Sequence, residues 1–181
     1  TPPRCDVREP HPAGNAFGFD AMLGDHTFHT KTAITHLPTA DPEVIVCQLH
    51  NGTNDRVSVR TKLISSQIRL VVDINGVEAT PRLDENYAIG DGFEIEIKIL
   101  DGGIVQLFYN DAVTPTVTGQ LTTTGTASWY WKVGAHAQFD ETSAGSTTEF
   151  VTVAHRELLV SHTGSRVSAG ADVTMTLGQT L

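Results

Sequence analysis

Apolar and polar residues alternate along most of this chain with a period of two. In FEIEIKI, at 93–99, one parity is Phe or Ile throughout and the other is Glu or Lys. This alternation is typical of β-strands with one buried face. It also predicts strands at 30–37, 42–52, 67–76, 103–111, 128–139 and 149–162, separated by turn signals such as Asn-Gly and Asp-Gly-Gly. Helical periodicity is scarce, so we predict an all-β protein, an antiparallel β-sandwich or jelly roll.

The opening segment alternates too, and it and two of the predicted strands place polar side chains along one face. A solvated outer face is the ordinary explanation for one such strand. Three together, if they lie side by side, indicate a binding surface. The residues are Arg4, Asp6 and Arg8 in RCDVR, Gln48 and His50 in VIVCQLH, and Tyr130, Lys132, His136 and Gln138 in YWKVGAHAQ.

Composition limits the classes of partner. The chain has 181 residues, 39% of them hydrophobic, which suits one domain with a sizeable core. We expect no membrane span, because no apolar run approaches about 20 residues, and no signal peptide. The net charge of −9 argues against nucleic-acid binding, although a local basic groove can still bind a polyanion. The opening residues read as the middle of a longer or processed chain.

The two cysteines are too few for a disulfide scaffold. By alternation Cys5 lies opposite the Arg4 face, and Cys47 shares a face with Ile45 and Leu49, whereas Val44 and Val46 lie with Gln48. We therefore expect both cysteines to be buried small hydrophobes. Whether they form a bridge stays open.

The three polar strands resemble the signature strands of the alginate lyases of polysaccharide lyase family 7. That family has R-[ST]-E-L-R, Q-[IV]-H and Y-F-K-A-G-x-Y-x-Q, in this order. Here the segments read RCDVR at 4–8, QLH at 48–50 and YWKVGAHAQ at 130–138. The resemblance spans about residues 4–162 and implies a concanavalin-like jelly roll with a groove on one concave sheet. Three positions depart from the pattern: His136 replaces a tyrosine, Asp6 a glutamate and Cys5 a small hydroxyl residue.

The resemblance implies β-elimination on a 4-linked uronate polymer such as alginate or glucuronan. Arg4, Gln48 and His50 would neutralise the uronate carboxylate, and His136 would transfer protons. Substrate-binding roles would fall to Arg8, Asp6, Tyr130, Lys132 and Gln138, with Asp6 holding the two arginines. A histidine is a better base than a neutral tyrosine at neutral pH. His136 serves as both base and acid if the C5 proton and O4 share a sugar face; otherwise His50 is the candidate base. The sequence leaves both open.

Other functions stay open. A carbohydrate-binding module without catalysis, within a larger viral tail or cell-surface protein, fits the same pattern. Zinc binding by His26 and His29, or by His50 and His136, has no second ligand pair in support. We expect no obligatory cofactor, no metal, an acidic polysaccharide as partner and a location outside the cell. We assign 1–163 to the lyase-like domain and 164–181 to a last strand or C-terminal extension.

Overall fold

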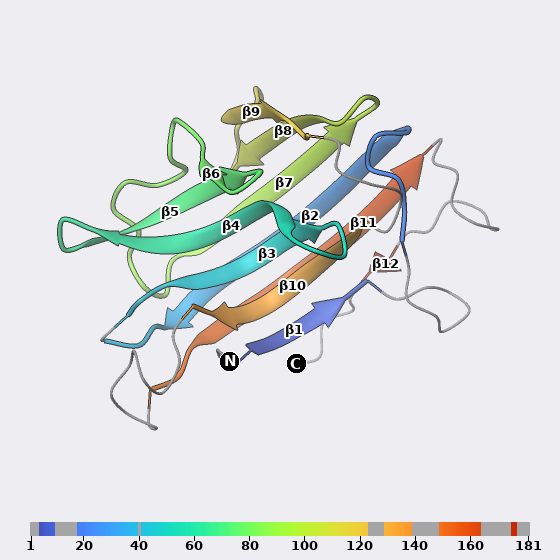
Figure 1. The fold of residues 1–181 in the computed structure, drawn as a ribbon. Helices are drawn as coiled ribbons and strands as arrows, with labels where there is room; N and C mark the ends of the chain where they lie inside the picture. The colour runs from blue at the N-terminus through green and yellow to red at the C-terminus, as the bar shows by residue number, and fades with distance from the viewer. Residues whose placement is uncertain are drawn as a thin grey trace.

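The fold is a sandwich of two antiparallel β-sheets (Figure 1). The computed structural model describes residues 4–9, 18–39, 41–122, 129–138, 149–163 and 175–176. Within these ranges there are twelve strands, six in each sheet, and no helix. The predicted all-β jelly roll is confirmed. No helical segment with the length and hydropathy of a membrane span occurs in the described ranges.

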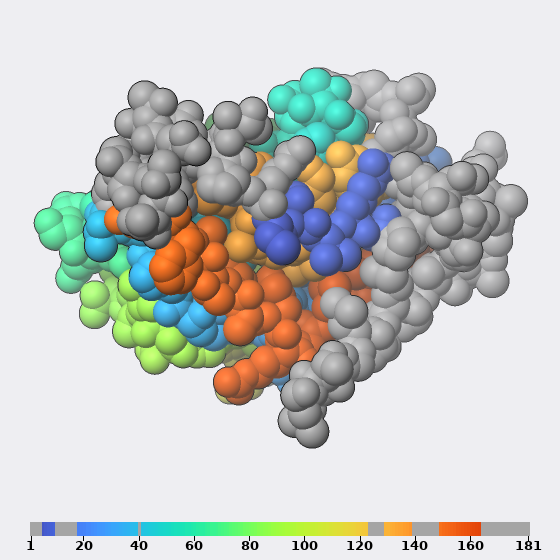
Figure 2. Space-filling view, turned by 90° about the horizontal axis from the view of Figure 1, so that it is seen from below, coloured from blue at the N-terminus to red at the C-terminus, as the bar shows by residue number. Residues whose placement is uncertain are grey.

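We name each sheet after one of its strands. The β10 sheet consists, in spatial order, of β1 (Arg4–Arg8), β10 (Tyr130–Ala137), β3 (Val44–His50), β4 (Asp55–Ile64), β5 (Gln67–Ile74) and β6 (Val77–Glu78). The β7 sheet consists of β12 (Met175–Thr176), β11 (Thr152–Thr163), β2 (Asp25–His36), β7 (Gly92–Leu100), β8 (Ile104–Tyr109) and β9 (Val117–Gln120). The first strand is thus an edge strand beside the tenth, and Figure 2 shows it at the surface between β10 and β11.

The core lies between the sheets and follows the predicted alternation. In β7 the apolar parity is buried, with Ile95, Ile97 and Ile99 fully inaccessible to solvent. From β10, Trp131 stacks on Phe28 of β2 with ring centroids 4.9 Å apart. Burial of each such side chain contributes about 1.5–3 kcal/mol. The core therefore fixes which face of β10 points outward.

Two expectations about side-chain faces are wrong. Cys5 is exposed, because β1 lies at the sheet edge and the inward parity of its residues is incompletely covered; Val7 is 57% exposed. In β3 a bulge places Ile45 opposite Arg60 and Cys47 opposite Val59. The strand β3 thus advances by two residues where β4 advances by one, and β3 contains one extra residue. The regular alternation that we assumed for β3 therefore fails at 44–46.

The bulge changes which side chains of β3 enter the core. Val44 and Val46 belong to the core cluster, whereas Ile45 is buried outside it. Cys47 is buried as expected and is a free thiol, and burial raises its pKa to about 12. This thiol is accordingly an unreactive core residue. The strand β4 was not among the strands predicted from the sequence.

Candidate active site

The three polar segments lie next to one another in the β10 sheet, in the order β1, β10, β3. In register, Arg4 is opposite His136, and Arg8 is opposite Lys132. On the other side of β10, Lys132 is opposite Gln48 and Tyr130 is opposite His50. Directly opposed residues of an antiparallel pair share a face. The polar side chains that the structure describes on these three separate segments therefore lie on one surface, which we call the β10 face.

Gly134 allows β1 to approach β10 closely. Its φ of +146° lies in a region that favours glycine, and a Cβ there would collide with the carbonyl oxygen of Cys5 and lie 2.7 Å from the Cα of Asp6. Beyond Gly134 the register between β10 and β3 shifts, so His136 is opposite Ile45. The glycine and the shift together place His136 between β1 and β3.

His136 is oriented by Gln48. The side-chain nitrogen of Gln48 lies 3.2 Å from Nδ1 of His136, and Gln48 is only 3% exposed. An amide N–H donates, so Nδ1 accepts in this arrangement, and a neutral ring then has its proton on Nε2. Rotation of the amide by half a turn would present its oxygen to an Nδ1–H and leave Nε2 without a proton. The amide orientation thus selects the form of His136 that faces a ligand.

His50 is held from the loop that follows β3. The backbone N–H of Gly52 donates to Nδ1 of His50 at 3.0 Å, and the imidazole stacks on Tyr130 with centroids 5.1 Å apart. Because Nδ1 accepts, a neutral His50 has its proton on Nε2. His50 can therefore donate a hydrogen bond from Nε2. While the ring is neutral and keeps this contact, Nε2 already bears a proton and cannot accept another.

Tyr130 is the centre of a stacked group of side chains. It is 7% exposed, with the guanidinium carbon of Arg8 3.4 Å and the Lys132 Nζ 5.6 Å from its ring centroid. A cation over an aromatic face gains about 0.5–2 kcal/mol. The arrangement holds two cations and His50 around one ring.

Asp6, Gln138 and Arg4 complete the set predicted from sequence. Asp6 Oδ2 lies 3.9 Å from Nζ of Lys132, and its expected role of holding the two arginines stays a prediction. The Gln138 side-chain amide donates to the backbone carbonyl of His136 at 3.2 Å, and the backbone N–H of Gln138 donates to the carbonyl of Glu43. The side chain of Arg4 lies outside the described part of the chain, although its backbone pairs with that of His136.

Strand β4 adds residues to this sheet that we did not predict. The segment DRVSVRTK alternates Arg56, Ser58 and Arg60 with two buried valines, and this alternation was the available signal. Ser58 is opposite Gln48, and Arg60 is opposite Ile45. Arg60 is neutralised by Glu43 at 3.0 Å and Asp73 at 2.8 Å. Arg60 is thus an ion-paired cation beyond the row of site residues.

Charge is distributed unequally between the sheets. The strands of the β7 sheet contain three basic and four acidic residues, whereas those of the β10 sheet contain seven and four. The seven are Arg4, Arg8, Arg56, Arg60, Lys62, Arg69 and Lys132. The sheet with the candidate site is therefore basic in a chain whose net charge is −9. An acidic polymer is favoured there by charge.

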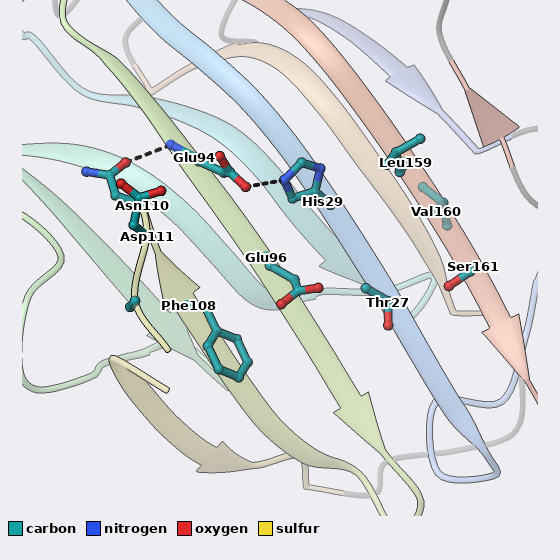
Figure 3. Close-up of a pocket in the computed structure, with 11 residues that line it drawn as sticks. Thr27, His29, Glu94, Glu96, Phe108, Asn110, Asp111, Leu159, Val160 and Ser161 are labelled. Carbon is teal, nitrogen blue, oxygen red and sulfur yellow. Dashed lines mark hydrogen bonds and ion pairs between the residues drawn. The ribbon is translucent and has the colours of Figure 1, made fainter. Parts of the chain in front are cut away.

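A hollow of about 580 Å³ lies on the outer face of the β7 sheet, away from this row of residues (Figure 3). Glu94, Glu96 and Asp111 contribute to its lining, and Nε2 of His29 donates to the Glu94 carboxylate at 2.7 Å. Three carboxylates would repel a polyanion. We therefore assign the candidate site to the β10 face on chemistry and not on the size of the hollow.

The two histidines considered for zinc do not converge. His26 is fully buried and its Nδ1 lies 2.8 Å from Nδ1 of His162, whereas His29 contacts Glu94 on the outer face. Three positions separate them along one strand, so they point to opposite faces of β2. Across the described ranges, no group of three or more His, Cys, Asp or Glu residues could hold a metal ion.

Comparison with known proteins identifies the family. A family model described as alginate lyase matches residues 1–162; a search of curated proteins gave no match. Among solved structures, the alginate lyase from Corynebacterium sp. superposes with a TM-score of 0.77 at 23% identity, covering 90% of this chain and 70% of that one. The lyase AlgAT5 from polysaccharide lyase family 7 gives 0.67 at 26% identity, with 85% and 70% covered.

A third solved structure contains a ligand. It is a tyrosine-to-phenylalanine variant of the family 7 alginate lyase A1-II′ in complex with a product denoted GGG, with a TM-score of 0.65 at 22% identity and 90% and 73% of the two chains covered. The family resemblance read from three short motifs is confirmed over the same part of the chain. The chain belongs to the alginate lyase family and is a polysaccharide lyase.

Proposed function

We propose that the β10 face binds an alginate-like polyuronate and cleaves it by β-elimination, with His136 as the proton-transfer residue. The observation that carries this proposal is the contact between the Gln48 amide and Nδ1 of His136, at 3.2 Å. It holds an imidazole in a defined orientation on the basic sheet. A group that transfers protons near neutral pH is thereby presented where a polyanion is favoured.

The chemistry explains why such a surface needs several donors. The C5 proton of a uronate is weakly acidic, and its removal builds negative charge on the adjacent carboxylate. We assign neutralisation of that carboxylate to Arg4, to His50 through Nε2–H, and to the side-chain N–H of Gln48. Donors aimed at developing charge are commonly a large part of catalysis, and loss of one costs about 10²–10³ in rate.

The proton steps follow from the two forms of His136. With the Gln48 oxygen facing Nδ1–H, Nε2 takes the C5 proton, the C–H electrons form the C4=C5 double bond, and the C4–O4 bond breaks. The resulting imidazolium then donates its Nε2 proton to O4. One residue suffices when the proton and O4 share a sugar face, as in mannuronate. We favour this course over His50 as base, since His50 accepts the Gly52 N–H at Nδ1.

Arg8 and Lys132 are assigned to neighbouring uronates of the polymer. Both lie against Tyr130, which fixes their positions relative to His136 along β10. A charged hydrogen bond of this kind contributes about 1.5–3 kcal/mol. Because the substrate is a polymer, we place the enzyme's action outside the cell.

The experiment is incubation with polymannuronate, polyguluronate and glucuronan while the ultraviolet absorbance of the unsaturated uronate is followed. We expect absorbance to rise with at least one polymer. His136→Ala should lower kcat by about 10²–10⁴, as expected for loss of general acid–base catalysis, with an unchanged unfolding midpoint. His136→Tyr is the matched control, because tyrosine is the motif residue at this position, and it should retain measurable activity.

Two results would oppose the assignment. Near-normal turnover by His136→Ala would remove this residue from the mechanism. No absorbance change with any polymer, combined with measurable binding of one, would leave a carbohydrate-binding surface without catalysis.

A further inference from the structure

Three buried titratable side chains form a hydrogen-bonded row at the end of β1. Glu9 follows Arg8 directly, and its Oε1 is 2.6 Å from Nε2 of His162 at the end of β11. Nδ1 of His162 is 2.8 Å from Nδ1 of His26 at the start of β2. Glu9 is 4%, His26 0% and His162 1% exposed. Buried ionisable groups need partners to be tolerated, and each of these three has one in the next.

The contacts show which atoms of His26, His162 and Glu9 bear protons. Nε2 of His26 lies 3.1 Å from the carbonyl oxygens of Asp20 and Leu23, so it bears a proton. Burial, and then the proximity of His162, lower the pKa of His26 to about 4, so the ring is neutral and Nδ1 accepts. His162 therefore donates from Nδ1. Its contact with Glu9 at 2.6 Å then needs one further proton, on the imidazole or on the carboxyl group.

The same glutamate fastens β1 to β10. Its backbone N–H donates to the carbonyl of Trp131 at 3.0 Å, and its Oε2 accepts the Trp131 N–H at 3.3 Å. Phe19 packs on both histidine rings, with centroids 4.3 and 4.4 Å away. The edge strand β1 is thus joined through Glu9 to β10 of its own sheet and, through the histidines, to both β11 and β2 of the other.

We propose that Glu9 and His162 are positioning residues, which hold the Arg8 end of β1 against β10 through a shared proton and so set the substrate-binding cations. This inference rests on the proposed function only for its catalytic readout. Arg8 is one residue from Glu9 and lies over Tyr130. His136 lies at the far end of β10, paired with the start of β1. Loss of the contact should therefore affect binding more than turnover.

The shared proton lies between Glu9 and His162. The other groups near these three side chains are the carbonyls of Asp20 and Leu23 and the carboxylate of Asp25, which slightly opposes the lowering of the His26 pKa. None of these supplies the shared proton.

Two variants of Glu9 separate the shared proton from the positioning. In Glu9→Gln the amide oxygen accepts the Trp131 N–H and the amide N–H donates to a neutral His162. The hydrogen bonds survive and the extra proton is no longer needed. In Glu9→Ala both contacts are lost. Glu85→Gln, at a carboxylate with a 61% exposed side chain, is the matched control for loss of one surface charge.

We expect Glu9→Ala to raise KM about tenfold, the effect of misplacing one charged hydrogen bond, with kcat within about threefold of wild type. Glu9→Gln should keep the wild-type KM, because both hydrogen bonds survive. Imidazole 15N shifts of wild type should report His26 protonated on Nε2 alone and His162 protonated on Nδ1.

Unchanged KM in folded Glu9→Ala would overturn the positioning role. A bare Nδ1 on His162 would overturn the shared proton. If Glu9→Ala does not fold, Glu9→Gln and the 15N shifts still decide the question. A wild-type protein without lyase activity would contradict the proposed function alone, because the 15N shifts do not require it.

Discussion

At the scale of single residues, the site depends on which ring nitrogens of His136 and His50 accept hydrogen bonds and which bear protons. Gln48 contacts Nδ1 of His136, and the Gly52 N–H contacts Nδ1 of His50. Both neutral rings then have their protons on Nε2. The difference is that a side-chain amide can rotate and a backbone N–H cannot. His136 can therefore exchange acid and base forms, whereas His50 remains a donor.

This difference predicts the effect of Gln48→Leu. The variant keeps a side chain of similar size but removes both the orienting contact and one donor. We expect kcat to fall about 10²-fold or more, as for loss of one donor to developing charge. Initial rates by ultraviolet absorbance measure it, with Ser58→Ala on the neighbouring strand as control. A kcat within twofold of wild type would show that the amide does not orient His136 during turnover.

At the scale of elements, the site depends on how closely an edge strand approaches its neighbour. Gly134 has a φ of +146°, and β1 passes where its Cβ would be. The strand β1 holds Arg8, and β10 holds Lys132 and His136 in register with it. One glycine thus controls the distance between two rows of functional side chains.

We therefore expect Gly134→Ala to displace β1. The free energy of unfolding should fall by about 2–4 kcal/mol, from backbone strain and the collision with Cys5, and KM should rise. Denaturant unfolding and steady-state kinetics measure the two effects. Gly92→Ala in β7 is the control, since nothing lies within 4 Å of a Cβ there. Equal behaviour of the two variants would mean that β1 tolerates the extra atom.

At the scale of the whole molecule, charge and burial act in different places. The basic excess lies in the β10 sheet, whereas buried neutral histidines lie between the sheets. Burial lowers the pKa of His155 to about 4, and burial with nearby His162 does the same for His26. An unfolded histidine has a pKa of about 6.5. Between these values the unfolded chain binds more protons than the folded one.

Stability should therefore be fully present above about pH 6.5 and fall as the pH drops toward 4, by up to about 1.4 kcal/mol per pH unit for each histidine. Denaturant midpoints across this range measure the fall. His155→Gln should reduce the slope relative to wild type, since it removes one of the two groups. Identical slopes would contradict a neutral, half-buried His155 in the fold.

Much of the fold was readable from local pattern. Alternation predicted β2, β3, β5, β7, β8, β10 and β11, because a strand with one buried face needs a period of two. It failed at Val44–Val46, where a bulge breaks the period, and at Cys5, where a sheet edge leaves an inward side chain uncovered. The two failures have different causes: a bulge changes which face a side chain points to, whereas a sheet edge leaves a face without a neighbour to cover it.

The sequence by itself determined the class of fold, the family motifs and the list of polar residues, because each depends on neighbours within one strand. Only the tertiary structure decided which of these residues meet. Gln48 reaches His136, Glu9 reaches His162 and Asp6 faces Lys132 across separations of 88, 153 and more than a hundred residues. Such contacts follow from strand order and register, which are set by the packing of the whole sandwich and not by any local pattern.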